Sequence, residues 1–332
     1  MEYDFEEERI IEEIKERKAK RILLQLPEGV KKEGLRLSKL IESKTNSKLF
    51  ISGGSCWGGC DLAVEEAKKI NVDLLVHFGH APFVNVKFPV LYIEMKAKVD
   101  LIPVLKKEIK KIEADKLALV GSVQYREQLG DVKGFLEDEG KKIIIPNKKG
   151  FSAFDGHVIG CEFSGLVKIG HKIEGCLVLG NKFHALGAAL TLVDIPVYLF
   201  DEHTNKIELM DKEKDKILKQ RAISLDRVRR ITKIGILVDM KPGQYNLERA
   251  EGLKKNLEKI GKKVVIIIVK EFNPDTLMNF YDVKGFIDTA CPRIAIDDYG
   301  RYDKPMINMR EAQILLGKLS WNGLLEEGLV GF

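Results

Sequence analysis

The chain has 332 residues, and 45% of them are hydrophobic, which is enough for two or three domains with hydrophobic cores. Lys and Arg number 55 against 50 Asp and Glu, so the net charge of +5 argues against a nucleic-acid partner. No apolar run approaches the roughly 20 residues of a membrane span, and the acidic N-terminus does not resemble a signal peptide. We therefore expect a soluble, cytoplasmic protein that binds neither nucleic acid nor a membrane directly.

Short β-rich runs alternate with helical patterns along the chain, which indicates an α/β fold with mostly parallel sheets. After a charged helix at residues 6–21, the first third has predicted strands at 21–29, 48–54, 73–80 and 90–95. A helix that extends to about residue 42 follows the first of these strands.

The same order of elements begins again at Lys116 and at Lys233. The second series has apolar runs at 116–125, 141–147, 157–161, 176–187 and 197–202, with a helix at 126–139. A charged helical stretch at 211–230 joins it to the third series, which has predicted strands at 233–244, 263–269, 285–291 and 305–309 and a helix at 246–261. We therefore predict three pseudo-repeated βαβ domains at residues 1–103, 104–212 and 213–332, repeated in element order rather than in sequence.

One cysteine occurs at a comparable depth in each predicted domain. Cys60, Cys161 and Cys291 lie 38, 44 and 57 residues after the first strand of their domain begins. Open α/β sheets bind ligands at the carboxyl ends of their strands, so domains arranged around a common centre would bring three thiolates together. Three thiolates fit zinc, or an iron–sulfur cluster with one iron left open. The alternative is that each cysteine is a small buried core residue.

The other two cysteines have weaker patterns. Five cysteines in a chain of this length do not form a disulfide framework in a reducing cytosol. Cys56 and Cys60 form a C-x3-C pair, but no third cysteine completes a conventional radical S-adenosylmethionine motif. Cys176 lies inside an apolar run and is predicted to be a core residue.

Seven short motifs occur in a specific order: QLPEG at residue 25, GGCDLA at 58, HFGHAPF at 77, VIGC at 158, GNKFHALG at 180, KPGQYN at 241 and DTACPRIAIDD at 288. In this order and spacing, the chain resembles the archaeal iron–sulfur subunit of diphthamide synthase over essentially its whole length. The resemblance implies that Cys60, Cys161 and Cys291 hold a 4Fe–4S cluster at the centre of the three domains. Cys56 departs from the family pattern: either it is a spare thiol near the cluster, or it leaves open which of Cys56 and Cys60 is the ligand. Cys60 is preferred because it lies in the GCDLA motif.

The resemblance also implies an activity and partners. The family cleaves the bond between the sulfur of S-adenosylmethionine and its methionine-side γ-carbon by unconventional radical chemistry. The resulting 3-amino-3-carboxypropyl group is transferred to a histidine of translation elongation factor 2, which is the first step of diphthamide biosynthesis. The archaeal form is a homodimer, and the sequence identifies neither its electron donor nor a catalytic residue.

Polar residues near the glycine-rich turns are candidate contacts to S-adenosylmethionine. No G-x-G-x-x-G motif is present, so ordinary nucleotide binding is not favoured. The candidates on turns are Glu28, Ser122, Gln124 and Gln244, each of which is alternatively a turn or cap residue.

Histidines and an arginine extend this set of candidates. His77, His80 and, in a comparable turn, His184 could line a cavity or be structural. Arg293 places a cation two residues after Cys291, where it could contact the cluster or the cofactor carboxylate, or instead pair with Asp297 or Asp298.

Two other functions remain compatible with the sequence. Quinolinate synthases are similar in having three pseudo-repeated domains that each supply one cluster cysteine, with the open iron acting as a Lewis acid in a dehydration. A zinc-held or purely apolar scaffold that binds a partner protein is the non-catalytic alternative. Iron content separates either cluster enzyme from the scaffold.

Overall fold

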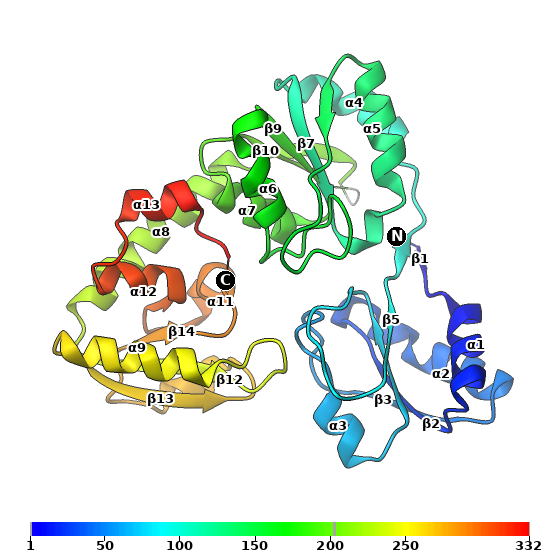
Figure 1. Ribbon diagram of the computed structural model, residues 1–332, viewed down its shortest axis with the longest axis horizontal. Helices are drawn as coiled ribbons and strands as arrows, with labels where there is room; N and C mark the ends of the chain where they lie inside the picture. The colour runs from blue at the N-terminus through cyan, green and yellow to red at the C-terminus, as the bar shows by residue number, and fades with distance from the viewer. Residues whose placement is uncertain (1, 202–203, 332) are drawn as a thin grey trace. The chain divides into compact units, whose positions relative to one another are not determined.

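The computed structural model describes residues 2–201 and 204–331 (Figure 1). The described residues form three sheets of four or five strands and one two-stranded pair. The chain divides into two compact units. Unit 1 contains the residues up to Asp100 together with Val123–Gln128 and Lys241–Gly243, and unit 2 contains the remaining segments. The prediction of an α/β fold with mostly parallel sheets is confirmed.

The main sheet of unit 1 has the strand order β3-β2-β4-β5, and all its neighbouring strands are parallel. Its strands are β2 (Arg21–Gln25), β3 (Lys48–Ile51), β4 (Leu74–Phe78) and β5 (Val90–Ile93). The other elements are β1 (Tyr3–Asp4), β6 (Lys96–Ala97), α1 (Glu7–Arg17), α2 (Gly34–Lys44), α3 (Val64–Lys69) and the 3-10 helices η1 (Glu28–Glu33) and η3 (Val123–Tyr125).

Both faces of this sheet are buried, because alternate residues of its strands belong to different hydrophobic clusters. Leu24 and Val76 pack with side chains of α1 and α2. Leu23 and Leu75 pack with side chains of α3 and the segment before it. Parallel strands covered on both faces are expected to be almost continuously apolar, as the sequences of β2 and β4 are.

The first sheet of unit 2 has the order β11-β10-β9-β7-β8, and only β11 runs antiparallel to its neighbour. Its strands are β7 (Lys116–Gly121), β8 (Lys142–Ile144), β9 (Gly175–Leu179), β10 (Val197–Asp201) and β11 (Lys206–Leu209). Its helices are α4 (Ile102–Glu108), α5 (Gln128–Asp138), α6 (Ser164–Ile169), α7 (Lys182–Thr191) and the 3-10 helices η2 (Ile109–Lys111) and η4 (Gly170–Lys172).

The second sheet of unit 2 has the order β13-β12-β14-β15, entirely parallel. Its strands are β12 (Lys233–Asp239), β13 (Lys263–Val269), β14 (Gly285–Asp288) and β15 (Met306–Asn308). Figure 1 shows α9 running along β12 and β13. The helices are α8 (Asp211–Arg230), α9 (Leu247–Lys259), α10 (Pro274–Met278), α11 (Ile294–Asp297), α12 (Met309–Leu315), α13 (Trp321–Glu327) and the 3-10 helix η5 (Tyr299–Arg301).

A continuous core and a buried ion pair join the two sheets of unit 2. One hydrophobic cluster extends from Val120 of β7 through Val228 of α8 to Ile307 of β15. Arg221 of α8 pairs with Glu311 of α12 at 2.6 Å, and both side chains are completely buried. The Arg221 guanidinium also donates to the backbone carbonyls of Ala295 and Met306. Its buried donors are therefore satisfied by acceptors that lie far from Arg221 in the sequence.

The apolar run at residues 157–161 does not form a strand. The segment makes a single parallel bridge, between Gly121 and His157, and does not continue as a strand. Gly156, just before this segment, and Gly160, within it, have φ values of +81° and +79°, which are outside the strand region. Glu202, the last residue of the run at 197–202, lies outside the described residues.

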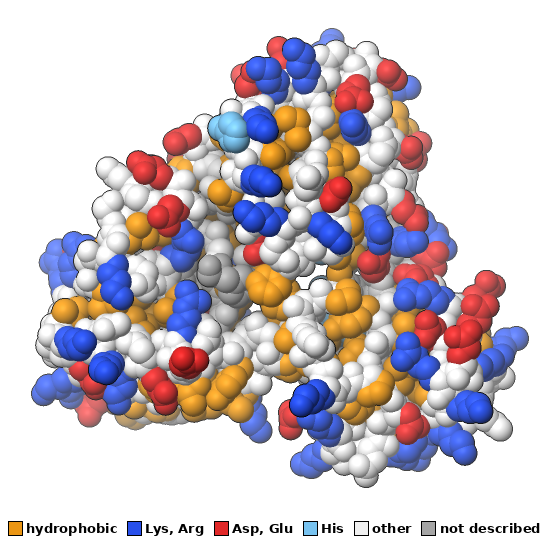
Figure 2. Space-filling model, in the orientation of Figure 1, with side chains coloured by type: hydrophobic (Ala, Val, Ile, Leu, Met, Phe, Trp, Pro, Cys, Tyr) orange, Lys and Arg blue, Asp and Glu red, His pale blue; other side chains and the backbone are white. Residues whose placement is uncertain are grey.

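The surface is consistent with the interleaved charges of the sequence. Figure 2 shows Lys and Arg side chains mixed with Asp and Glu side chains on the face in view. Within the described ranges, no helix combines the length and the apolar character that crossing a bilayer requires.

Candidate metal centre

Close backbone contacts within unit 1 hold the loop that carries Cys60. Cys60 is half-buried, and its carbonyl accepts a hydrogen bond of 2.8 Å from the Gly243 N–H. A Cβ atom on Gly243 would lie 2.6 Å from Cys60 Cα, so only glycine permits this approach. Gly59 is equally constrained, because its Cβ would lie 2.5 Å from the carbonyl oxygen of Ala81. The glycines around Cys60 therefore fix the position of its backbone.

His77 lies on β4, opposite Gln25 of the neighbouring strand β2. The Ala63 N–H donates to Gln25 Oε1 at 3.0 Å, which identifies this oxygen as an acceptor. His77 Nδ1 lies 2.9 Å from the same oxygen, so Nδ1 carries the proton and donates it. His77 Nε2 is then left with a lone pair, and it faces His80 Nδ1 at 3.0 Å.

Burial controls the protonation of these side chains. It lowers the pKa of His77 well below the ordinary histidine value, and the neighbouring His80 lowers it further. It also lowers the pKa of His80 to about 4. Burial raises the pKa of the Cys56 thiol, whose sulfur lies within 4.8 Å of a ring nitrogen of each histidine. At neutral pH the two imidazoles are therefore uncharged.

Cys161 and Cys291 both lie in unit 2, and the side chain of Arg293 links their loops. Arg293 Nη1 donates to the carbonyl of Gly160, which directly precedes Cys161, and to the carbonyl of Phe183 at 2.8 Å. Its other nitrogens make a bidentate pair with Asp297 at 2.7 and 2.8 Å. The pairing with Asp297 that the sequence left open is therefore present, and it joins a buried guanidinium to a partly exposed carboxylate.

Asp288, which the sequence analysis did not select, lies at the end of β14 beside Cys291. Its Oδ1 accepts hydrogen bonds from the N–H groups of Ala290 at 2.8 Å and Cys291 at 3.2 Å. Its Oδ2 is buried and has no hydrogen-bond partner in the described structure. Burial raises the pKa of this carboxyl to about 7, and the nearby Asp239 adds to the effect. The sequence feature that could have identified Asp288 is its position three residues before Cys291.

The remaining predicted contacts have different environments. Glu28 is exposed and pairs with Lys31 at 3.0 Å, while Gln124 donates to the Gly79 carbonyl at 2.7 Å. His184 pairs through Nδ1 with the α7 cap residue Asn181 at 2.8 Å. Ser122 is buried at the end of β7, and Gln244 is half-buried after the turn that contacts Cys60.

The five cysteines fall into two groups by exposure. Cys60, Cys161 and Cys291 are half-buried, whereas Cys56 and Cys176 are buried. Cys176 is completely buried within the hydrophobic cluster of unit 2, which confirms the prediction that it is a core residue. The accessible thiols are thus the three that the sequence analysis selected as ligands.

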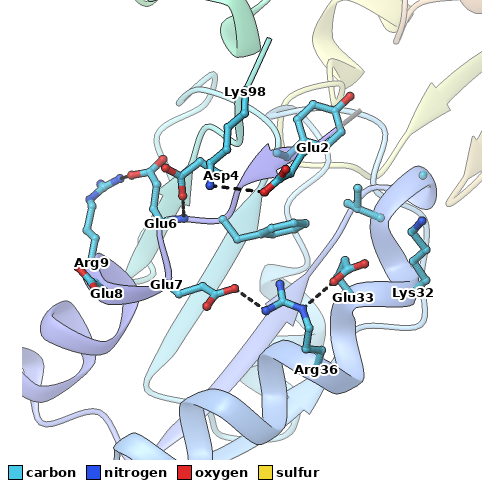
Figure 3. A pocket seen from close by; sticks show the side chains of 14 residues that line it. Glu2, Asp4, Glu6, Glu7, Glu8, Arg9, Lys32, Glu33, Arg36 and Lys98 are labelled. Atoms are coloured by element: carbon cyan, nitrogen blue, oxygen red, sulfur yellow. Dashed lines mark hydrogen bonds and ion pairs between the residues drawn. The ribbon is translucent and has the colours of Figure 1, made fainter. Parts of the chain in front are cut away.

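A hollow of about 790 Å³ lies near the N-terminus, and its lining contains none of the predicted site residues. Figure 3 shows that it is lined by charged side chains, several of which pair with one another. Arg36, for example, donates to Glu33 at 2.8 Å and also pairs with Glu7. The size of this hollow is therefore no reason to regard it as the active site.

The comparisons with known proteins concern the chain as a whole. The family model described as "Putative diphthamide synthesis protein" matches residues 26–325. The chain belongs to this family. A 2-(3-amino-3-carboxypropyl)histidine synthase from Pyrococcus horikoshii is 32% identical, over 93% of this chain and 89% of the relative. Subunit 1 of the Saccharomyces cerevisiae enzyme is 28% identical, over 95% of this chain and 75% of that subunit.

The structural comparison extends the family match to the whole fold. The crystal structure of Dph2 from Pyrococcus horikoshii with a 4Fe–4S cluster matches this chain with a TM-score of 0.89. The two chains are 29% identical, and the match covers 100% of this chain and 95% of the other. These matches favour a cluster enzyme of the diphthamide family over the quinolinate synthase and scaffold alternatives.

Proposed function

We propose that this chain is a 2-(3-amino-3-carboxypropyl)histidine synthase that performs the first step of diphthamide biosynthesis. The observation that carries the proposal is the match to the Pyrococcus horikoshii enzyme over nearly the full length of both chains. The reaction transfers the 3-amino-3-carboxypropyl group of S-adenosylmethionine to a histidine of a protein, translation elongation factor 2. The enzyme acts as a homodimer and receives an electron from a donor that is yet to be identified.

The residues of this chain fit a 4Fe–4S cluster. Cys60, Cys161 and Cys291 are its proposed ligands, one from each of three domains at residues 1–103, 104–212 and 213–332. Cysteine thiolates are the usual ligands of such a cluster. These three thiols are half-buried and therefore accessible to it, whereas the other two are buried. The bound cluster would supply the electron that cleaves the sulfonium and an open iron that holds it.

The protein's own groups position these ligands. Gly243 and Gly59 allow the backbone to approach Cys60 closely. Asp288 holds the N–H of Cys291, and Arg293 ties the carbonyl before Cys161 to the helix that follows Cys291. Buried backbone and side-chain contacts of this kind keep ligand loops in place and exclude water from the reacting groups.

The activity test uses anaerobically purified, reduced protein with S-adenosylmethionine and elongation factor 2. The expected products are 5′-methylthioadenosine and elongation factor 2 that carries one additional 3-amino-3-carboxypropyl group on a histidine. Release of 5′-deoxyadenosine instead would show cleavage on the other side of the sulfonium and refute the proposal.

The ligand test is the iron content of cysteine variants, because about four irons per chain are expected in the wild type. Replacing Cys60, Cys161 or Cys291 singly by alanine should remove most of the iron. Cys176→Ala is the matched control and should leave the iron content unchanged. Retention of iron in Cys60→Ala together with its loss in Cys56→Ala would reassign the first ligand.

A further inference from the structure

We propose that Cys56, His77 and His80 form a second metal site that binds a zinc-type divalent cation in unit 1. None of these residues is among the three proposed iron ligands. Their ligand atoms, one sulfur and two ring nitrogens, all lie within 4.8 Å of one another. Thiolate and imidazole are the ligands that zinc prefers, whereas magnesium and calcium select oxygen donors.

The hydrogen bonds around His77 orient it as a metal ligand. Gln25 Nε2 donates to the Asp61 carbonyl at 2.6 Å, and the Ala63 N–H donates to Gln25 Oε1. The amide is thereby fixed, and its oxygen accepts the proton on His77 Nδ1. A ligating histidine characteristically donates its second ring N–H to such an oxygen, which directs the other nitrogen at the metal.

His80 faces the same point because of the turn between the two histidines. Gly79 has a φ of +82°, and a Cβ atom there would lie 2.8 Å from the ring of Pro27. This turn brings His80 Nδ1 to 3.0 Å from His77 Nε2. Two nitrogens bound to a tetrahedral zinc at 2.0–2.1 Å are about 3.3 Å apart, so a shift of a few tenths of an ångström admits the ion.

Without a cation, the two facing ring nitrogens can hydrogen-bond only if one of them carries a proton and the other does not. Because His77 Nε2 has no proton, His80 Nδ1 must carry one to make the observed contact. To bind a cation, His80 would carry its proton on Nε2 instead of Nδ1, and the Cys56 thiol would release its proton to solvent. The cation would then accept lone pairs from both rings and from the Cys56 thiolate. Three protein donors would leave one coordination position for water.

Such a site would also fix the loop that carries Cys60. Cys56 begins this loop, and Gly59 within it contacts the Ala81 carbonyl next to His80. A metal bound to Cys56 and both histidines would therefore cross-link the loop to the end of β4. The site itself does not depend on the proposed transferase activity.

The test is elemental analysis and zinc-edge X-ray absorption of the full-length protein, purified without oxygen and equilibrated with one equivalent of Zn²⁺. We expect about one zinc per chain to remain after gel filtration, with one sulfur at about 2.3 Å and nitrogen or oxygen neighbours at about 2.0 Å. Cys56→Ser and His80→Asn should each reduce bound zinc at least tenfold. Cys176→Ala, which removes another buried thiol, should retain it.

Iron content distinguishes this inference from the proposed function. Cys60→Ala should lose iron and keep zinc, while Cys56→Ser should do the reverse. The inference is refuted by a wild type that holds no zinc, by zinc with three sulfur neighbours, or by variants at Cys56 and His80 that bind zinc normally. Absence of transferase activity in a protein that holds zinc at this site would refute only the proposed function.

Discussion

Arg293 is the residue on which the two ligand loops of unit 2 most directly depend. Its side chain is 2% exposed, yet its nitrogens reach Asp297 and the carbonyls of Gly160 and Phe183. The planar guanidinium also lies 4.0 Å from the centre of the Phe183 ring. Removing this side chain should lower the stability of the folded protein, because Asp297 and the two carbonyls lose their hydrogen-bond donor at the same time.

We therefore expect Arg293→Ala to lower the free energy of unfolding of the cluster-free protein by about 2–3 kcal/mol. Arg293→Lys should recover only part of the loss, because an ammonium cannot donate along the fork that Asp297 and the carbonyls require. Denaturant unfolding followed by circular dichroism measures both effects.

Arg301 is the matched control for this substitution. It pairs with Asp298 at 3.5 Å across a similar short spacing, but its side chain is 57% exposed. Arg301→Ala should change the free energy of unfolding by less than about 0.5 kcal/mol. Equal effects at the two arginines would show that the buried network is not important for stability.

At the scale of elements, helix α7 can approach the Cys161 loop only because it carries Gly187. A Cβ atom at this position would lie 2.4 Å from Arg293 Nη1 and 2.6 Å from the Gly160 carbonyl oxygen. The backbone atom is the decisive neighbour, since it cannot move aside as a flexible side chain can. The helix, the arginine and the loop therefore share one closely packed position.

Gly187→Ala should lower the free energy of unfolding by about 1–3 kcal/mol, although alanine is the better helix former. Gly252→Ala in α9 is the comparison, because that exposed position has no atom within 4 Å of an added Cβ. It should raise the free energy of unfolding by about 0.5–1 kcal/mol. If close packing determines the effect at Gly187, denaturant titration of the two variants should give changes in the free energy of unfolding of opposite sign. A Gly187→Ala variant that is more stable than the wild type would contradict the packing explanation.

The elements were predictable where a local pattern determines them. The apolar runs of β2, β4, β7, β12 and β14 were predicted because buried parallel strands require continuous apolar side chains. The apolar run at 157–161 does not form a strand, and hydrophobicity alone does not report the positive φ of Gly156 and Gly160. Arg293 is held in part by hydrogen bonds to the carbonyls of Phe183 and Gly160, which lie 110 and 133 residues away in the chain. No local sequence pattern contains these contacts.

At the scale of the whole molecule, the proposed cluster ligands are far apart in the sequence. Cys60, Cys161 and Cys291 are separated by 101 and 130 residues, so periodicity could suggest them as a group but could not show that they converge. The motifs around them predicted the family, which the comparisons support over residues 26–325. The buried, unpartnered oxygen of Asp288 could not be predicted, since burial is a property of the folded chain.

A cluster held by residues from all three thirds of the chain should stabilise the folded state, because the unfolded chain cannot bind it in the same way. For binding at a thousand times Kd, the gain is about 4 kcal/mol, which corresponds to a rise in Tm of about 6 °C for a chain of this length. Anaerobic calorimetry of cluster-loaded and cluster-free protein measures this difference.

The cysteine variants connect that difference to the ligands. In Cys291→Ala, cluster reconstitution should no longer raise the Tm above that of the cluster-free protein, because one of three ligands has been removed. In Cys176→Ala the gap should persist even if both Tm values fall, since a buried thiol lost from the core of unit 2 affects both forms equally. A gap that survives in Cys291→Ala would mean that the iron is held elsewhere, and the three thiols would then need another explanation for their exposure.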